Sequence, residues 1–298
     1  MVLIELLKSS QATFLTCLGL LGLIMGSFLN VIIWRLPKML HREWTEQCYT
    51  YIQENSKLFP LAELPQPSPS FNLITPRSQC PTCQHPIGIL ENIPLLSFLF
   101  LRGKCLACRS PISLRYPLIE ILSAILSIVV GYYFGVSWQC FAALLLTWAL
   151  ISLTFIDIEH QLLPDDITLA MLWLGLIVNI PHLFVSINDA IIGVIIGYLF
   201  LWSIYWIFKL ITHKEGMGYG DFKLLAMLGA WLGWQALPKI ILISSIVGAI
   251  VGITLIILKR HTREKPLPFG PFLAMAGWIS LIWGDKLSHL YFSMLGLS

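Results

Sequence analysis

Two aspartates stand out because each lies at the end of a long apolar segment. Asp157 closes the run "ISLTFID", and Asp221 opens the run "DFKLLAML" directly after the glycine-rich loop "GMGYG". Ionisable residues within or beside membrane-length apolar segments are functional candidates. For Asp221, a helix N-cap is the alternative explanation, because aspartate is favoured there and glycine suits the preceding turn. Asp157 has no such explanation, since the dipole of a helix C-terminus disfavours an anion.

The chemistry available to Asp157 and Asp221 is aspartyl proteolysis, provided that the two side chains face each other. Like charges at close range cannot both ionise, so a facing pair holds one shared proton. The ionised member can act as a base on water while the protonated member polarises a peptide carbonyl. Three glycines in residues 216–220 would let an extended substrate backbone approach Asp221. Asp165 and Asp166 open the next apolar segment, and N-capping explains at least one of them.

Four cysteines form a second group, and their spacing is that of a metal site. They occur as two C-x-x-C pairs, "CPTC" and "CLAC", 21 residues apart. Two such pairs indicate a four-thiolate zinc site, in which each pair supplies two sulfurs from one tight turn, and the interval between them is slightly longer than usual. Four sulfurs saturate the ion, so the zinc would be structural. Disulfides or a redox role are the alternatives. The predicted ligands are Cys80, Cys83, Cys105 and Cys108.

The composition indicates that membrane-spanning helices position these groups. The 298 residues are 57% hydrophobic and 12% charged, with a mean hydropathy of +0.78, and soluble domains carry roughly twice that share of charge. A span needs about 20 mostly apolar residues. We therefore predict an all-α polytopic membrane protein with about eight transmembrane helices. The segments are 11–34, 117–137, 139–156, 167–187, 190–211, 222–237, 239–258 and 268–284.

Residues 35–116 are the only stretch between apolar segments that is long and polar enough to form a domain of its own. They contain a proline-rich part that disfavours helix. Within them, residues 87–101, "IGILENIPLLSFLFL", are too short to span and either lie on the membrane surface or pack within the insert. We predict a first transmembrane helix (1–34), a zinc-binding insert (35–116) and a transmembrane aspartyl protease core (117–298).

The basic residues predict the orientation. With the N-terminus outside, the inner side and its border residue Lys223 together hold 16 of the 19 lysines and arginines, as the positive-inside rule requires. The zinc insert is then cytoplasmic, and Asp157 and Asp221 lie near the same membrane face. The inner stretches are 35–116, 157–166, 209–221 and 259–267.

Several motifs taken together resemble one known family. "GYGD" fits the G-x-G-D motif of intramembrane-type aspartyl proteases. The paired C-x-x-C motifs add to it, as do "GSFLNVIIWRLP", "ENIPLLSFLFLRGKC", "DIEHQLLPDD" and "PFGPFLA". With these motifs the chain resembles the type IV prepilin leader peptidases and N-methyltransferases over nearly its whole length, with residues 39–79 as the main departure.

This resemblance implies a bifunctional enzyme of the bacterial cytoplasmic membrane with a periplasmic N-terminus. The family cuts type IV prepilins and type II secretion pseudopilins at the inner face and then methylates the new amino terminus with S-adenosylmethionine. By the resemblance, Asp157 and Asp221 match the catalytic aspartates, and the four cysteines match the zinc ligands. The implied partners are these protein substrates and the lipid bilayer, with no nucleic acid.

The methyl-donor site rests on the resemblance alone, because the sequence has no glycine fingerprint for a nucleotide-like cofactor. The resemblance points to the insert, with Gly103 and Lys104 in "RGKC" as candidates. A tight turn leading into the zinc knuckle is the alternative for both. The alternative function is a transporter or proton channel with Asp157 and Asp221 as relay carboxylates. Transporter sites usually lie near the membrane midplane, whereas these aspartates lie at segment ends.

Overall fold

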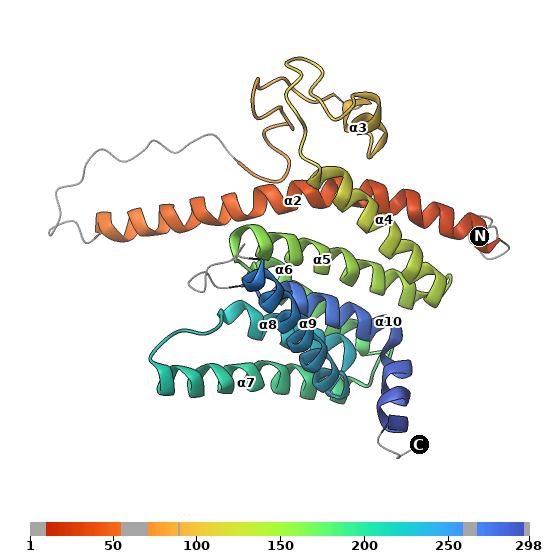
Figure 1. Cartoon of the computed structure of the whole chain (residues 1–298), viewed down its shortest axis with the longest axis vertical. Helices are drawn as coiled ribbons and strands as arrows, with labels where there is room; N and C mark the ends of the chain where they lie inside the picture. Colours follow the sequence, from red (N-terminus) through yellow and green to blue (C-terminus); the bar gives the residue numbers. More distant parts are fainter. Residues whose placement is uncertain (1–9, 55–70, 89, 259–266, 295–298) are drawn as a thin grey trace. The chain divides into compact units, whose positions relative to one another are not determined.

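The computed structural model describes residues 10–54, 71–88, 90–258 and 267–294. Within these ranges the regular structure is helical, apart from isolated bridges that pair Gln79 with Pro86 and Lys104 with Pro111. The prediction of an all-α membrane protein is confirmed. The helices (Figure 1) are α2 (Gln11–Glu54), η2 (Leu90–Asn92), α3 (Leu96–Phe100), α4 (Arg115–Phe134), α5 (Trp138–His160), α6 (Asp165–Asn179), α7 (Ile187–Thr212), α8 (Tyr219–Leu232), η3 (Trp234–Ala236), α9 (Leu237–Ile257) and α10 (Gly270–Met294).

Each of the eight predicted apolar segments contains a helix, but the helices differ in length. Among the described residues, five are long and apolar enough to cross a membrane: α2, α4, α5, α7, and α9 together with η3. Helices α6 and α8 have only 15 and 14 residues, and the apolar part of α10 is Gly270–Gly284. At 1.5 Å per residue, α8 extends about 21 Å, less than the roughly 30 Å of a bilayer core. Eight spans therefore stay a prediction.

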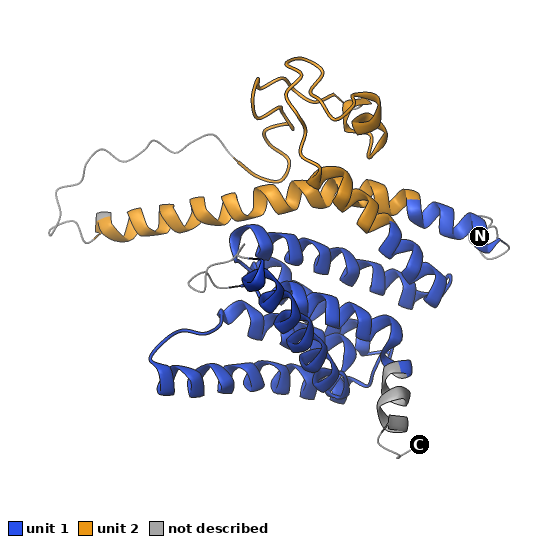
Figure 2. Ribbon diagram, viewed as in Figure 1, with its two compact units in different colours: residues 1–19, 125–298 blue, residues 20–124 orange. Residues whose placement is uncertain are grey.

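The chain forms two compact units, shown in Figure 2. One comprises residues 20–124 and contains the four paired cysteines; the other comprises residues 1–19 and 125–298 and contains both candidate aspartates. Helix α2 continues past residue 34 to Glu54 and includes Pro37. Proline in the interior of a helix normally kinks or breaks it, but α2 continues through Pro37.

Helix α8 is the centre of the larger unit. It contacts α6, α7, α9 and α10, and ten of its residues between Asp221 and Trp231 are buried. Because other helices enclose it, α8 need not match the thickness of the bilayer by itself. This explains how a helix of 14 residues can lie in the middle of the membrane unit.

Glycines bring α7 and α8 into backbone contact. A Cβ atom on either Gly193 or Gly229 would overlap the backbone of the other residue. A Cβ atom on Gly197 would lie 2.8 Å from the carbonyl oxygen of Leu225. Small residues allow such close approach, which is a main source of attraction between helices in membranes. The position of α8 against α7 is thereby fixed.

Hydrogen bonds from α6 fix the C-terminal end of α8. The Asn179 amide donates to the carbonyl oxygens of Ala230 and Trp231 at 2.9 and 3.2 Å. In return, the Trp231 indole donates to the carbonyl oxygen of Met171 at 2.8 Å. These bonds satisfy carbonyl groups that a helix end otherwise leaves without partners. Helix α8 is thus held firmly at the end opposite to Asp221.

In the smaller unit, α2 and the first turns of α4 also pack backbone against backbone. A Cβ atom on Gly26 would lie 2.5 Å from the Cα atom of Glu120. The Asn30 amide donates to the carbonyl oxygen of Tyr116 at 3.2 Å. The contact therefore places Glu120, a carboxylate only 8% exposed, between two apolar helices.

Candidate active site

Asp157 lies in the last turn of α5 and is 6% exposed. The helix begins at Ser137, whose hydroxyl accepts a hydrogen bond from the backbone N–H of Cys140. It ends at Gln161, which adopts the left-handed conformation and donates its N–H to the carbonyl oxygen of Asp157 at 2.9 Å. The main chain of Asp157 is therefore capped, and its carboxylate remains inside the unit.

Asp221 lies in the first turn of α8 and is 7% exposed. The N-cap position belongs to Gly218, and the cap makes no side-chain hydrogen bond. The alternative explanation of Asp221 as an N-cap is therefore wrong. An acidic side chain in the first turn still benefits from the positive end of the helix dipole, and the backbone N–H of Gly218 is directed at the Asp221 carboxyl group.

The two carboxylates meet at one end of the helix bundle. The charge of Asp157 acts on the carboxyl group of Asp221. Leu163 contacts the residues next to both carboxylates. A Cβ atom on Gly220, the residue before Asp221, would be 2.8 Å from the Cβ of Leu163, and a Cβ atom on Gly270, which faces Asp157, would be 3.2 Å from the Cδ1 of Leu163. The end of α5, the start of α8 and the start of α10 therefore converge.

Gly270, the first residue of α10, supports the Asp157 carboxylate. A Cβ atom there would lie 2.5 Å from Asp157 Oδ2, so no other residue fits without a shift. The Gly270 N–H is directed at this carboxyl group, and the N-terminal end of α10 favours an anion. The start of α10 thus offsets the unfavourable position of Asp157 at the C-terminal end of α5. Among the described residues, the buried Oδ2 atom has no hydrogen-bond partner of ordinary geometry.

Asp165 and Lys223 join the beginnings of α6 and α8. The Lys223 ammonium donates to both carboxylate oxygens of Asp165, each at 2.7 Å. The N-cap of α6 is Pro164, without a side-chain cap bond, and Asp165 and Asp166 both lie in the first turn. The expected N-capping by these aspartates is therefore not found. The ion pair instead anchors the helix turn that carries Asp221.

A polar cluster missed by the sequence analysis holds the glycine loop. The Lys209 ammonium donates to Glu215 Oε1 at 2.9 Å and to the Tyr205 hydroxyl at 3.1 Å. This contact lowers the pKa of Glu215. The buried Tyr205 ring also packs against Tyr219 and Phe222, with ring centroids 5.2 and 5.7 Å apart. The loop before Asp221 is therefore tied to the end of α7. The only sequence signal was the spacing of Tyr205 and Lys209 on one helix face.

The four paired cysteines come together as predicted. Their sulfur atoms lie within 4.8 Å of one another, with 3.8 Å between Cys80 and Cys108 and 4.0 Å between Cys83 and Cys105. Four sulfurs around a zinc ion at about 2.3 Å are about 3.8 Å apart, so the cluster fits a tetrahedral metal ion. All four are free thiols, and the disulfide alternative is not found. Backbone N–H groups of Cys83 and Thr82 lower the pKa of the Cys80 thiol to about 6, which favours the ligating thiolate.

The two cysteine turns have the same backbone geometry. The N–H of Cys80 donates to the carbonyl oxygen of His85, and that of Cys105 to the carbonyl oxygen of Ser110, both at 2.9 Å. The residue after each pair, Gln84 or Arg109, has a φ of 59 or 58°. A repeated C-x-x-C-x-x-P-I pattern encodes this similarity in the sequence.

Comparison with known proteins places these two constellations in one family. Residues 20–134 match the bacterial peptidase A24 N-terminal domain, and residues 144–253 match the type IV leader peptidase family. The chain belongs to the type IV leader peptidase family. A relative from Aeromonas hydrophila called prepilin leader peptidase/N-methyltransferase is 54% identical over 97% of this chain and 98% of its own length. Relatives of the same name from Pseudomonas aeruginosa (51%, 99% of each chain) and Dichelobacter nodosus (46%, 98% of each chain) also match. No solved structure matches the chain.

Within this leader peptidase, the two methyl-donor candidates lie at the entrance to the second cysteine turn. Gly103 has a φ of +67°, and a Cβ atom there would lie 3.0 Å from Phe98 Cζ. Its N–H donates to the carbonyl oxygen of Phe98 at 2.8 Å. The tight-turn alternative therefore accounts for the glycine. Lys104 follows as an exposed cation paired through the main chain with Pro111.

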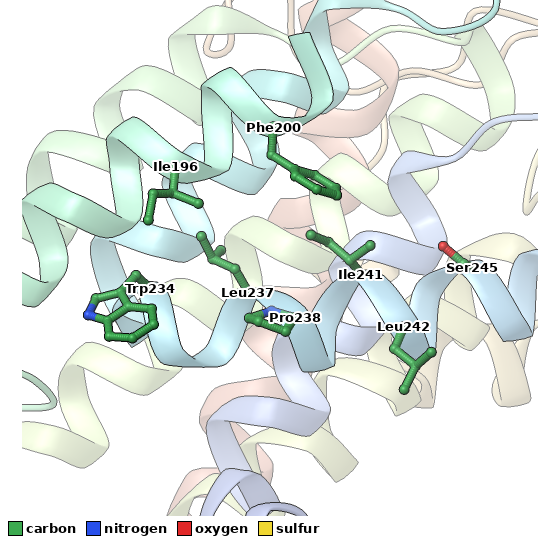
Figure 3. A pocket seen from close by; sticks show the side chains of 8 residues that line it. All are labelled: Ile196, Phe200, Trp234, Leu237, Pro238, Ile241, Leu242 and Ser245. Atoms are coloured by element: carbon green, nitrogen blue, oxygen red, sulfur yellow. The ribbon is translucent and has the colours of Figure 1, made fainter. Parts of the chain in front are cut away.

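An apolar pocket of about 360 Å³ lies between α7 and the start of α9, as shown in Figure 3. Ile196 and Phe200 of α7 line one side, and Leu237 and Ile241 of α9 line the other. Ser245 is the polar residue at one end. The pocket is lined by Ile196, Phe200, Trp234, Leu237, Pro238, Ile241, Leu242 and Ser245, so it offers an apolar surface without a carboxylate or a thiol.

We predict that Gly270→Ala lowers leader-peptidase activity by about 10²-fold, because small misplacements of catalytic groups can cost that much. The added methyl group would displace the Asp157 carboxylate. Gly284→Ala in the same helix is the matched control, since a Cβ atom there meets nothing within 4 Å. Initial rates of purified, membrane-reconstituted variants provide the measurement. Equal rates for the two alanine variants would contradict the role of Gly270.

We predict that exchanging the charges of Asp165 and Lys223 preserves most activity, whereas either single change does not. Lys223→Asp or Asp165→Lys puts like charges together and should lower the rate about tenfold, within the range of coupled pairs. The double variant restores the attraction. Asp166→Asn serves as the control and should change little. A double variant no more active than the single variants would show that the ion pair does not position α8.

Proposed function

We propose that this chain cleaves the leader peptide of prepilins and then methylates the new amino terminus. Relatives at about half identity over nearly the full chain carry both activities in their names. The observation that supports the protease assignment most strongly is the convergence of Asp157 and Asp221, both more than nine-tenths buried, at one end of the helix bundle.

Cleavage uses one ionised and one protonated carboxyl group. The ionised aspartate removes a proton from water as the water oxygen attacks the scissile carbonyl carbon. The protonated aspartate donates to the carbonyl oxygen and stabilises the developing charge. The carbon–nitrogen bond then breaks, and the departing amine takes up a proton from the pair. Asp157 Oδ2, which has no hydrogen-bond partner of ordinary geometry in the described part of the chain, is the oxygen available to hold the proton or to bind the water.

The glycine loop admits the substrate. Gly218 is the open position of the loop, because a Cβ atom there would meet nothing closer than 4.0 Å, so an extended backbone can lie close to the loop that leads to Asp221. The Tyr205–Lys209–Glu215 cluster holds the loop against the end of α7. Pre-positioned loops of this kind reduce the entropy lost on reaching the transition state.

Methylation follows on the released amino terminus, with S-adenosylmethionine supplying the methyl group. We place the donor on the insert, the only large polar surface among the predicted parts. Lys104, an exposed cation directly after the Gly103 turn, could pair with a donor carboxylate. Cleavage and methylation would then use different parts of the chain.

The metal ion is zinc in this proposal, and its role is structural. The four-sulfur geometry supports it, because thiolates select zinc and four of them leave no open position. Cys80, Cys83, Cys105 and Cys108 hold it. The ion joins two turns that share little other packing.

The proposed location is the bacterial inner membrane, with the N-terminus periplasmic and the insert cytoplasmic. The charge distribution supports this orientation. Type II secretion pseudopilins are proposed as further substrates. The alternative function, a transporter or proton channel, is not favoured, because the homologues are peptidases by name and the aspartates lie at helix ends.

We predict that Asp157→Asn and Asp221→Asn each lower leader cleavage by at least about 10²-fold, because acid–base catalysis contributes about 10² to 10⁴. The protein should remain folded and inserted, since asparagine preserves the shape. A purified prepilin and mass analysis of the product measure cleavage, with Asp189→Asn in the first turn of α7 as the control. Substantial cleavage by either folded variant would rule out the pair.

We predict that each chain binds one zinc ion. Cys83→Ser should lose the ion, and the insert should then lose its ordered structure, because zinc ligation supplies folding energy of about 10 kcal/mol in small modules. Elemental analysis measures the metal.

We predict that Lys104→Ala retains zinc but lowers methylation more than cleavage, measured with labelled methyl donor on the same samples. Pure protein without zinc would contradict the first expectation, and a parallel loss of both activities in zinc-loaded Lys104→Ala would contradict the second.

A further inference from the structure

The short helix α3 turns its apolar side chains outward. Leu96, Leu99 and Phe100 are 51, 62 and 83% exposed, and residues three and four apart lie on one helix face. Ser97 and Phe98 are the half-buried members, and Phe98 packs against Gly103. The surface formed by Leu96, Leu99 and Phe100 is here called the α3 face. An insert surrounded by water would bury such apolar side chains, whereas the α3 face exposes them.

A hydrogen bond to the buried Glu120 carboxylate fixes the position along α4 at which α3 begins. The Leu95 N–H, directly before α3, donates to Glu120 Oε2 at 2.8 Å. Glu120 lies five residues into α4, about 7.5 Å from its first residue at 1.5 Å per residue. Helix α4 is itself long and apolar enough to span a membrane, and at Glu120 it touches Gly26 within the apolar part of α2. The start of α3 therefore lies beside the membrane-embedded portion of these helices, not beyond their end.

The charges that follow the α3 face match a lipid surface. Residues 93–119 contain four basic residues and no acidic residue. Arg102, Lys104 and Arg109 are exposed, within nine residues after Phe100. An apolar face followed by cations is the pattern of a segment that enters the boundary between acyl chains and anionic headgroups.

We propose that the α3 face is a membrane anchor of the insert, immersed in the leaflet at the end of α4 that carries the insert, with Arg102 and Lys104 among anionic headgroups. The bond from Leu95 to Glu120 holds the anchor at that depth. Because the second cysteine turn begins at Cys105, the anchor keeps the metal-binding turns against the bilayer. The proposal concerns lipid alone and does not depend on the proposed catalytic function.

Photo-crosslinking of the full-length protein in vesicles of phosphatidylethanolamine and phosphatidylglycerol tests the proposal. Phe100 is replaced by p-benzoylphenylalanine, and lipid adducts are measured by mass after irradiation. Ile125, 52% exposed on α4, is the lipid-facing reference. Tyr51, 70% exposed near the far end of α2, is the aqueous reference. The Phe100 site should give adducts at the level of Ile125 and at least ten times that of Tyr51.

Other outcomes would contradict either the insertion of the α3 face into lipid or the contact of the basic residues with anionic headgroups. Adduct formation at Phe100 no higher than at Tyr51 would overturn the proposal, as would crosslinking to an added prepilin in place of lipid. Phosphatidylglycerol should form adducts at more than twice its molar share, and Lys104→Ala with Arg102→Ala should remove this excess. Adducts in proportion to the molar share would overturn the role of the basic residues.

Discussion

Two carboxylates of like charge, each more than nine-tenths buried, impose the constraint on which the larger unit depends. At close range they cannot both ionise, so the unit must hold one proton between them and stabilise one negative charge. It does so with helix ends: Asp221 lies in the first turn of α8, and the start of α10 faces Asp157. The placement of three helix termini at one point follows from this requirement.

The arrangement of α8 shows how the membrane unit supplies rigidity where it is needed. Glycine contacts with α7 and hydrogen bonds from α6 hold the helix along its length. At its beginning, the Asp165–Lys223 ion pair adds to the packing of the Tyr205 ring against Tyr219 and Phe222. Glycines thus serve two purposes: Gly193 and Gly229 let backbones touch, whereas Gly220 and Gly270 make room for side chains, Leu163 at the first and Asp157 at the second.

The smaller unit solves a different problem. Its cysteine turns enclose few buried side chains, and many of its apolar residues are exposed, among them Leu106 and Leu114 at 60 and 71%. Small modules that cannot build a hydrophobic core commonly rely on a metal ion. If the four cysteines hold a metal ion, as proposed, that ion organises the interior, and the apolar side chains are available to face lipid. A metal module and a membrane surface are then complementary ways to stabilise one insert.

The sequence by itself determined the membrane class, the apolar segments, the cysteine pairs and the two aspartates. These features are expressed in composition, in runs of about 20 residues or in fixed spacings, all of which are local. Only the tertiary structure decided that Gly270 faces Asp157, that Asp165 pairs with Lys223 and is not a cap, and that α2 continues through Pro37. Each depends on partners or packing that local patterns do not record.

Gly270 lies more than one hundred residues after Asp157 in the sequence, and no periodicity relates them. Their contact exists because α5 and α10 pack side by side, and helix packing is decided by the shapes of whole surfaces.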